Sequence, residues 1–312
     1  MHSKLDRREF IKTGTLLGAG VIFGRILPGL YSDSSDLFAM DIPEISVIQG
    51  DDYFANTIKA VDALGSMKNF VKKNSTVGLL INSRYNKPGT FVKPEIALAV
   101  LNMCFSSGAK EIISLENVSN SYWRLSSFSK KYSEIINRIK PAGGNYIKVK
   151  IPKGISLKEA EIEKSLLDCD VFINIPIFKQ HEGVQATGCL KNLMGLTSSE
   201  TNKYFHFGSK ANDWYADVNF LSQCIADINL IRKPDLCIAD ATEYITTNGP
   251  FGPGNVVKTK KILAGKDPVA LDSYGARLLG HNPEDIPPIK MAFKHGLGQI
   301  DLSKVKIQEI KV

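Results

Sequence analysis

The sequence predicts an α/β fold, with a mostly parallel sheet flanked by helices, in a single large domain behind an N-terminal leader. Short β-rich runs alternate with helical patterns from Glu44 to the end of the chain, and this order builds parallel sheets. A hydrophobic share of 43% supports a substantial core. The first residues combine a basic start, a short Gly-rich apolar run and small residues further on, which is typical of a secretory leader.

The leader is predicted to be a twin-arginine (Tat) signal peptide over residues 1–39. Arg7 and Arg8 stand in the run Asp6–Lys12, which resembles the consensus of two arginines, any residue, a large apolar pair and then often Lys. Cleavage after Ala39 leaves a domain of residues 40–312. The Tat translocase is then a partner during export, and the periplasm or cell envelope is the expected location.

An uncleaved leader that anchors the protein in a membrane is the alternative. Only twelve uncharged residues separate Lys12 from Arg25, fewer than the roughly 20 apolar residues that span a bilayer. An anchor would have to run from Thr13 to Ser32, with Arg25 snorkelling near its end.

Eight runs have the composition and length of strands. They are Ile45–Ile48, Val77–Ile81, Glu111–Leu115, Tyr146–Ile151, Val171–Ile175, Leu236–Ala239, Ile262–Ala264 and Val305–Ile310. Helices are expected between them, one with Ile96, Val100, Leu101 and Cys104 at helical spacing and a C-cap near Gly108, and another over Asp213–Arg232.

Residues that directly follow these strands have priority in the search for a site, because ligands bind beyond the carboxyl ends of strands in open α/β sheets. They are Asn82, Glu116, Asn117, Pro176, Lys179 and Asp240. The densest polar cluster begins after Ile175 and runs to Gly195. A second loop, Asn248–Gly254, is rich in Gly and Pro and is expected to form a closely approaching turn with no phosphate-loop context.

The chain resembles the family called domain of unknown function 362 (DUF362). A buried strand runs into Pro176-x-x-Lys179-x-His181, then Thr187, then Leu190-Lys-Asn-Leu-Met-Gly195. The loop Gly249–Gly254, the segment Leu263–Asp272 and the closing Gly296-Leu-Gly298 are similar to further motifs of the family. The resemblance covers about residues 45–312. At Asn82–Asn86 the chain departs from it, because relatives show Lys-Pro-Asn there and Arg84 supplies charge without an amine nucleophile.

The resemblance implies no settled reaction, and the cofactor is unknown. Many members carry a ferredoxin-like segment and are held to be iron-sulfur proteins, but this chain has no such segment. Its five cysteines are far apart and form no C-x-x-C pair, so we expect no iron-sulfur cluster. Small apolar core positions suit them better.

Three residues are the central catalytic candidates. Lys179, His181 and Lys191 could place two ammonium groups and an imidazole around one anionic group, and a helix opening near Lys191 would add main-chain N–H groups. Asp240 is the fourth candidate, because a carboxylate at a strand end can orient a Lys or His. The alternative is that these side chains only tie down a long loop.

Four further residues are candidate binding groups for the substrate: Asn82, Thr187, Asn192 and Asp272. His206 is a candidate second acid/base, or a metal ligand together with His181, and a packed histidine is the alternative. Asp267 precedes Pro268 and is expected to cap a helix.

These patterns predict an exported enzyme of unknown reaction that binds a small anionic substrate or cofactor. A non-catalytic periplasmic binding or accessory protein and an electron-transfer partner are the alternatives. The net charge of +7 is spread along the chain, and no stripe of basic and aromatic residues indicates a nucleic-acid partner.

Overall fold

The eight-stranded sheet at the centre of the molecule confirms the predicted fold class. The computed structural model describes residues 42–208 and 217–312, so Arg7, Arg8 and the predicted cleavage site lie outside the described residues. The sheet order is β12-β1-β11-β10-β7-β2-β3-β4. Its strands, in chain order, are β1 Ile45–Gln49, β2 Thr76–Ile81, β3 Glu111–Ser114, β4 Ile139–Lys140, β7 Val171–Ile175, β10 Leu236–Ile245, β11 Val256–Gly265 and β12 Ile307–Lys311.

All strands of this sheet except β11 run in one direction. β11 pairs antiparallel with both β1 and β10, whereas the other neighbours pair in parallel. The parallel register puts Leu79 opposite Ile173 and Ile81 opposite Ile175. The carboxyl ends of β2, β3 and β7 therefore meet at one edge of the sheet.

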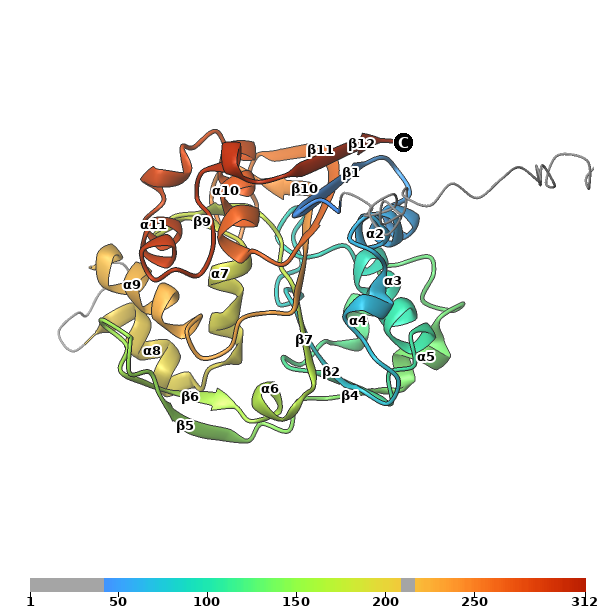
Figure 1. Ribbon diagram of the computed structural model, residues 1–312, viewed down its shortest axis with the longest axis horizontal. Coiled ribbons are helices and arrows are strands. Elements are labelled where there is room, and N and C mark those ends of the chain that lie inside the picture. The colour runs from blue at the N-terminus through green and yellow to red at the C-terminus, as the bar shows by residue number, and fades with distance from the viewer. Residues whose placement is uncertain (1–41, 209–216) are drawn as a thin grey trace, which may run out of the picture. The chain divides into compact units, whose positions relative to one another are not determined.

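Helices cover both faces of the sheet, as Figure 1 shows, with α2 to α5 on one side and α7 to α11 on the other. The helices are α2 Tyr53–Asp62, α3 Pro94–Ser106, α4 Asn120–Trp123, α5 Ser133–Asn137, α6 Ser165–Asp168, α7 Cys189–Asn192, α8 Ser199–Phe207, α9 Val218–Ile228, α10 Pro268–Leu278 and α11 Pro287–Lys294. Short 3₁₀ turns are η2 Met67–Asn69, η3 Leu193–Leu196, η4 Pro283–Asp285 and η5 Leu302–Lys304.

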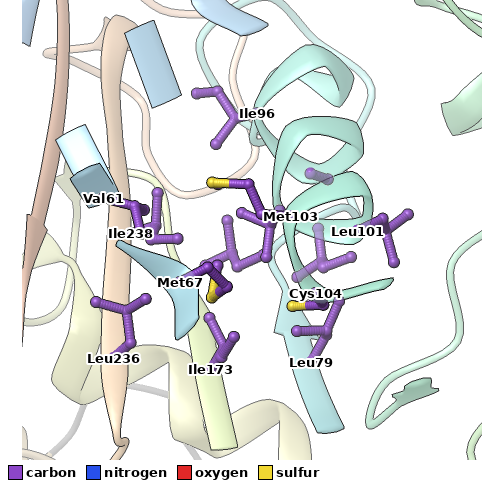
Figure 2. Packing of buried hydrophobic residues seen from close by; sticks show 14 of the residues in the cluster. Val61, Met67, Leu79, Ile96, Leu101, Met103, Cys104, Ile173, Leu236 and Ile238 are labelled. Carbon is purple, nitrogen blue, oxygen red and sulfur yellow. The ribbon is translucent and has the colours of Figure 1, made fainter. Parts of the chain in front are cut away.

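Alternation along each strand divides the core between the two faces. Leu79 and Ile238 join the cluster under α2 and α3, whereas Leu80 and Ala239 face the opposite clusters. Figure 2 shows the first cluster, with side chains of the strands packed against those of α3. Full burial of one such aliphatic side chain stabilises the fold by roughly 1.5–3 kcal/mol.

Three predicted elements differ from the structure. The run Tyr146–Lys150 is a strand, β5, but it forms a separate antiparallel ribbon with β6 (Glu159–Glu163). Most of its side chains are exposed, so it could not serve as a buried central strand. β10 and β11 each extend beyond their predicted ends and pair along most of their length.

Two N-terminal caps fix the starts of long helices. Asp267 accepts hydrogen bonds from the main-chain N–H groups of Val269 and Ala270, both at 2.9 Å, so the predicted cap of α10 is confirmed. The helix expected over Asp213–Arg232 is α9, which begins after the cap residue Asp217; residues 213–216 lie outside the described residues.

Candidate functional site

A cavity of about 390 Å³ opens beyond the carboxyl ends of β2, β3 and β7, within the roughly 300–1,000 Å³ typical of small-molecule sites. Seven of the residues expected in a site line it: Asn82, Lys179, His181, Thr187, Lys191, Asn192 and His206. Arg84, Tyr85, Glu116, Met194, Gly195, Asn202, Pro250 and Phe251 complete its wall.

Lys179 begins the hairpin that follows β7. β8 (Lys179–His181) pairs antiparallel with β9 (Gln185–Thr187), and Lys179 is only 1% exposed. Its ammonium group donates to the carbonyl oxygen of Thr90 at 2.6 Å and lies 4.4 Å from the ring centre of Tyr85. Burial, reinforced by the charge of Lys191, lowers the pKa of Lys179 to about 7.

Main-chain contacts fix the tautomer of His181. Its Nδ1 accepts from the N–H groups of Gly183 at 3.1 Å and Val184 at 3.3 Å. An N–H group can only donate, so Nδ1 carries the lone pair and Nε2 carries the proton. Burial and the neighbouring lysines hold the pKa of His181 far below its usual value, and it is therefore a neutral hydrogen-bond donor.

His206 on α8 has the opposite tautomer. Its Nδ1 lies 2.9 Å from the carbonyl oxygen of Asn202, which can only accept, so Nδ1 is protonated and Nε2 carries the lone pair. Burial lowers its pKa. The two histidines of the cavity therefore carry their protons on different ring nitrogens. No group of three or more His, Cys, Asp or Glu suited to a metal occurs among residues 42–208 and 217–312.

Lys191 on α7 is the second ammonium group of the cavity. It donates to the sulfur of Met194 at 3.4 Å, and burial lowers its pKa to about 8. In the described ranges neither Lys191 nor Lys179 forms an ion pair with a carboxylate. The cavity thus holds two amino groups, one buried and one partly buried, with which no carboxylate of the described residues pairs.

An amide relay runs from the sheet into the cavity wall. Nδ2 of Asn174 donates to the carbonyl oxygen of Cys189 at 2.9 Å, Nδ2 of Asn192 to Oδ1 of Asn174 at 2.8 Å, and Nδ2 of Asn82 to Oδ1 of Asn192 at 3.0 Å. Because a carbonyl oxygen only accepts, every amide in the relay has one orientation. Oδ1 of Asn82 is left buried and without a hydrogen-bond partner in the described chain.

The hydroxyl of Thr187 is also buried without a hydrogen-bond partner in the described chain. Thr187 is 5% exposed, and its Oγ1 has no hydrogen-bond partner among the described residues. A buried hydroxyl without a partner costs free energy, so a polar ligand atom beside it would relieve that cost.

Asp240, expected at a strand end facing Lys or His, lies in the middle of β10 and does not line the cavity. Its carboxylate accepts from the main-chain N–H of Lys93 at 2.7 Å and from the N–H and hydroxyl of Thr242, both at 2.7 Å. Strand alternation explains the difference, since Asp240 points to the same face as Ile238, toward α3. It holds the chain before α3 in place.

Asp272, expected as a binding residue, also stays outside the cavity. Its carboxylate accepts from the N–H groups of Cys189 at 2.5 Å and Leu190 at 2.9 Å, and burial raises its pKa to about 7. The N–H groups of Cys189 and Leu190, the first two of α7, are therefore occupied. Gly188 permits this contact, because a Cβ there would lie 2.3 Å from Oδ1 of Asp272.

Glu116, which lies shortly after β3, is an acidic residue of the cavity wall. It is not among the predicted catalytic or binding residues. Burial raises the pKa of Glu116 to about 7, against the opposing charge of Arg84. Tyr85 and Phe251, with ring centres 5.2 Å apart and nearly perpendicular, form an aromatic wall beside Lys179. The Gly/Pro-rich loop that carries Phe251 does approach closely, because a Cβ on Gly249 would lie 1.7 Å from the carbonyl oxygen of Gln180.

Comparison with known proteins shows the family to which the chain belongs. Residues 73–277 match the family model "Domain of unknown function (DUF362)", and the chain belongs to this family. It is 24% identical over 269 residues to the thylakoid-associated protein sll1697 of Synechocystis sp., covering 82% of this chain and 80% of that protein.

Two solved structures are also similar. The apoprotein of lactate racemase from Thermoanaerobacterium thermosaccharolyticum matches with a TM-score of 0.46 and 11% identity over 74% of this chain. A protein from Thermotoga maritima matches with a TM-score of 0.43 and 13% identity over 79%. The chain covers 56% and 60% of these two structures. None of the helices in the described ranges has the length and apolar character of a membrane span.

Proposed function

We propose that this protein is an enzyme that binds a small organic anion in the cavity at the carboxyl ends of β2, β3 and β7. The carrying observation is the pair of lysines in the cavity, Lys179 buried and Lys191 partly buried, which no carboxylate of the described residues neutralises. Burying charge is costly without a counter-ion. A bound anion supplies that counter-ion, and the hydroxyl of Thr187 offers it a further hydrogen bond.

Anion binding is tested by calorimetric titration of the purified protein with sulfate, inorganic phosphate, malonate and succinate. Lys191→Met keeps most of the side-chain volume and removes the charge, so we expect affinity for the best binder to fall at least about tenfold, roughly the weight of one charge-assisted hydrogen bond. Lys153→Met is the matched control, because Lys153 is exposed and outside the cavity. Equal affinity of Lys191→Met and the unmodified protein would contradict the proposal.

Two features favour an enzyme over a non-catalytic binding protein. With a pKa of about 7, Lys179 carries a substantial share of neutral amine at neutral pH, which a base or nucleophile requires. His206 adds a second group to the cavity wall that can exchange a proton. Proton NMR of the best-binding anion over hours should show conversion that Lys179→Met abolishes. Tight binding without conversion by the unmodified protein would favour the binding-protein alternative.

We also propose that residues 1–39 direct Tat export. The support is the sequence around Arg7 and Arg8 alone. A reporter fused after residue 39 should reach the periplasm of a bacterial host, and the double Arg7→Lys, Arg8→Lys variant should remain in the cytoplasm. Export of that variant would refute the proposal.

A further inference from the structure

Glu116, a partly buried acid, differs from the buried aspartates Asp240 and Asp272. Its main chain is anchored by the hydroxyl of Ser114, which donates to the carbonyl oxygen of Glu116 at 2.6 Å. Its carboxylate, however, accepts no hydrogen bond and forms no ion pair in the described part of the chain, although it lines the cavity. The carboxylates of Asp240 and Asp272, by contrast, accept hydrogen bonds from main-chain N–H groups.

The surroundings of this carboxyl group favour its neutral form. Gly195 lies against it, since a Cβ there would stand 2.8 Å from Oε2 of Glu116 and 3.6 Å from Leu80. Glycine at this position of the Leu-Met-Gly sequence lets the carboxyl group lie directly against the main chain of η3. Burial in this place raises the pKa of Glu116 to about 7, so a proton is available to it at neutral pH.

Other charged and titratable groups face the same space from several elements. Arg84 and Tyr85 follow β2, Lys179 and His181 lie on β8, Lys191 lies on α7 and His206 on α8. Tyr146 on β5 is close enough for the charge of Glu116 to raise its pKa. An anion held by Lys179 and Lys191 would repel an ionised Glu116, whereas a protonated Glu116 can donate to it.

We propose that Glu116 binds the anion as a neutral acid, so that one proton and one anion enter the cavity together and the carboxyl O–H of Glu116 donates a hydrogen bond to the anion. The inference depends on the proposed anion binding. The carboxyl O–H bond is the one bond that changes: it forms with a proton from solvent, persists on Glu116 while the anion is bound, and breaks when the anion leaves and the proton returns to solvent. The residue thus selects ligands that can accept a hydrogen bond beside the lysines.

Two substitutions at one position separate donation from repulsion. Glu116→Gln keeps the shape and supplies N–H donors at every pH, whereas Glu116→Leu removes the donor. With succinate as the probe at pH 7, we expect Glu116→Gln to bind within about threefold of the unmodified protein and Glu116→Leu to bind at least about fivefold more weakly, the loss of one hydrogen bond. Tighter binding by both variants would show that Glu116 is ionised and repels the anion, and would overturn the inference.

The proton itself is counted by calorimetry in buffers with different ionisation enthalpies. At pH 7 the unmodified protein should take up about half a proton more per succinate than Glu116→Gln, because a group with a pKa of about 7 is half protonated before binding. Lys179 contributes equally in both proteins, so the difference isolates Glu116. Equal proton uptake would also overturn the inference. If succinate does not bind, the best binder of sulfate, phosphate and malonate takes its place in both measurements. Absence of binding of all four anions by the unmodified protein between pH 6 and 8 would instead refute the anion site, and the inference with it.

Discussion

The chain treats two of its buried aspartates differently from the two lysines of the cavity. The carboxylates of Asp240 and Asp272 accept hydrogen bonds from N–H and hydroxyl groups of the chain itself. Among the described residues, the amino groups of Lys179 and Lys191 contact a carbonyl oxygen, an aromatic ring and a thioether, and no carboxylate pairs with them. The aspartates hold the main chain, whereas under the proposed function the two lysines bind a ligand.

The largest expected effect is on the acid side of this comparison. Asp272→Ala leaves the buried N–H groups of Cys189 and Leu190 without acceptors, so we expect the free energy of unfolding to fall by about 3 kcal/mol. Urea unfolding followed by circular dichroism measures it. Asp272→Asn retains one acceptor oxygen and should lose less. If both variants are as stable as the unmodified protein, Asp272 does not hold α7.

Lys179 should show the opposite behaviour, with a dependence on pH. Its folded pKa of about 7 lies below the value of about 10.4 for an unfolded lysine, so the unfolded chain binds more protons between these values and stability rises with pH there. The Lys179→Met variant lacks this pH-dependent contribution to the free energy of unfolding. Its stability relative to the unmodified protein should therefore be greatest near pH 7 and decline by roughly 1 kcal/mol per pH unit up to pH 9.5.

A paired lysine provides the control for that measurement. Lys261 donates to Tyr274 at 2.7 Å and to Glu309 at 3.0 Å, and these hydrogen bonds outweigh the opposing effect of burial and raise its pKa. Lys261→Met should show no such decline between pH 7 and 9.5. A parallel decline in both variants would mean that the pH effect does not come from Lys179.

The smallest expected effect concerns Thr187. Thr187→Val preserves the shape and removes a hydroxyl that has no partner in the described residues, so we expect unfolding free energy to stay within about 1 kcal/mol of the original or to rise. Anion affinity should fall about threefold to tenfold in the titration used for Lys191→Met. A stability loss without a change in affinity would assign the hydroxyl to the fold.

The fold class and most strands could be predicted because burial and alternation leave direct marks on the sequence. The strand direction of β11 could not, since antiparallel and parallel strands buried on both faces have the same composition. Tyr146–Lys150 has the alternation of a strand but too many exposed side chains for the central sheet, and partner choice depends on contacts distant in sequence.

The candidate site likewise contains residues that could be predicted from the sequence and residues that could not. Lys179, His181 and Lys191 line one cavity because they follow a buried strand on one hairpin and the adjoining helix. Asp240 was also expected at the end of a strand, but β10 continues to Ile245, so Asp240 lies inside the strand and away from the cavity. Glu116 carried the signal of a strand end and could have been included, whereas Asn202 and Phe251 reach the cavity from a helix and a loop without any such mark. The catalytic and binding roles of the predicted site residues stay predictions.

The amide relay gives the cavity wall a polarity that is decided away from the cavity. Each of the three amides is polar at both ends, and turning any one of them would bring oxygen against oxygen or nitrogen against nitrogen. The carbonyl oxygen of Cys189, at the start of α7, sets the direction for all of them. The amide oxygen of Asn82 consequently points away from the relay, so any ligand bound beside it would meet a hydrogen-bond acceptor.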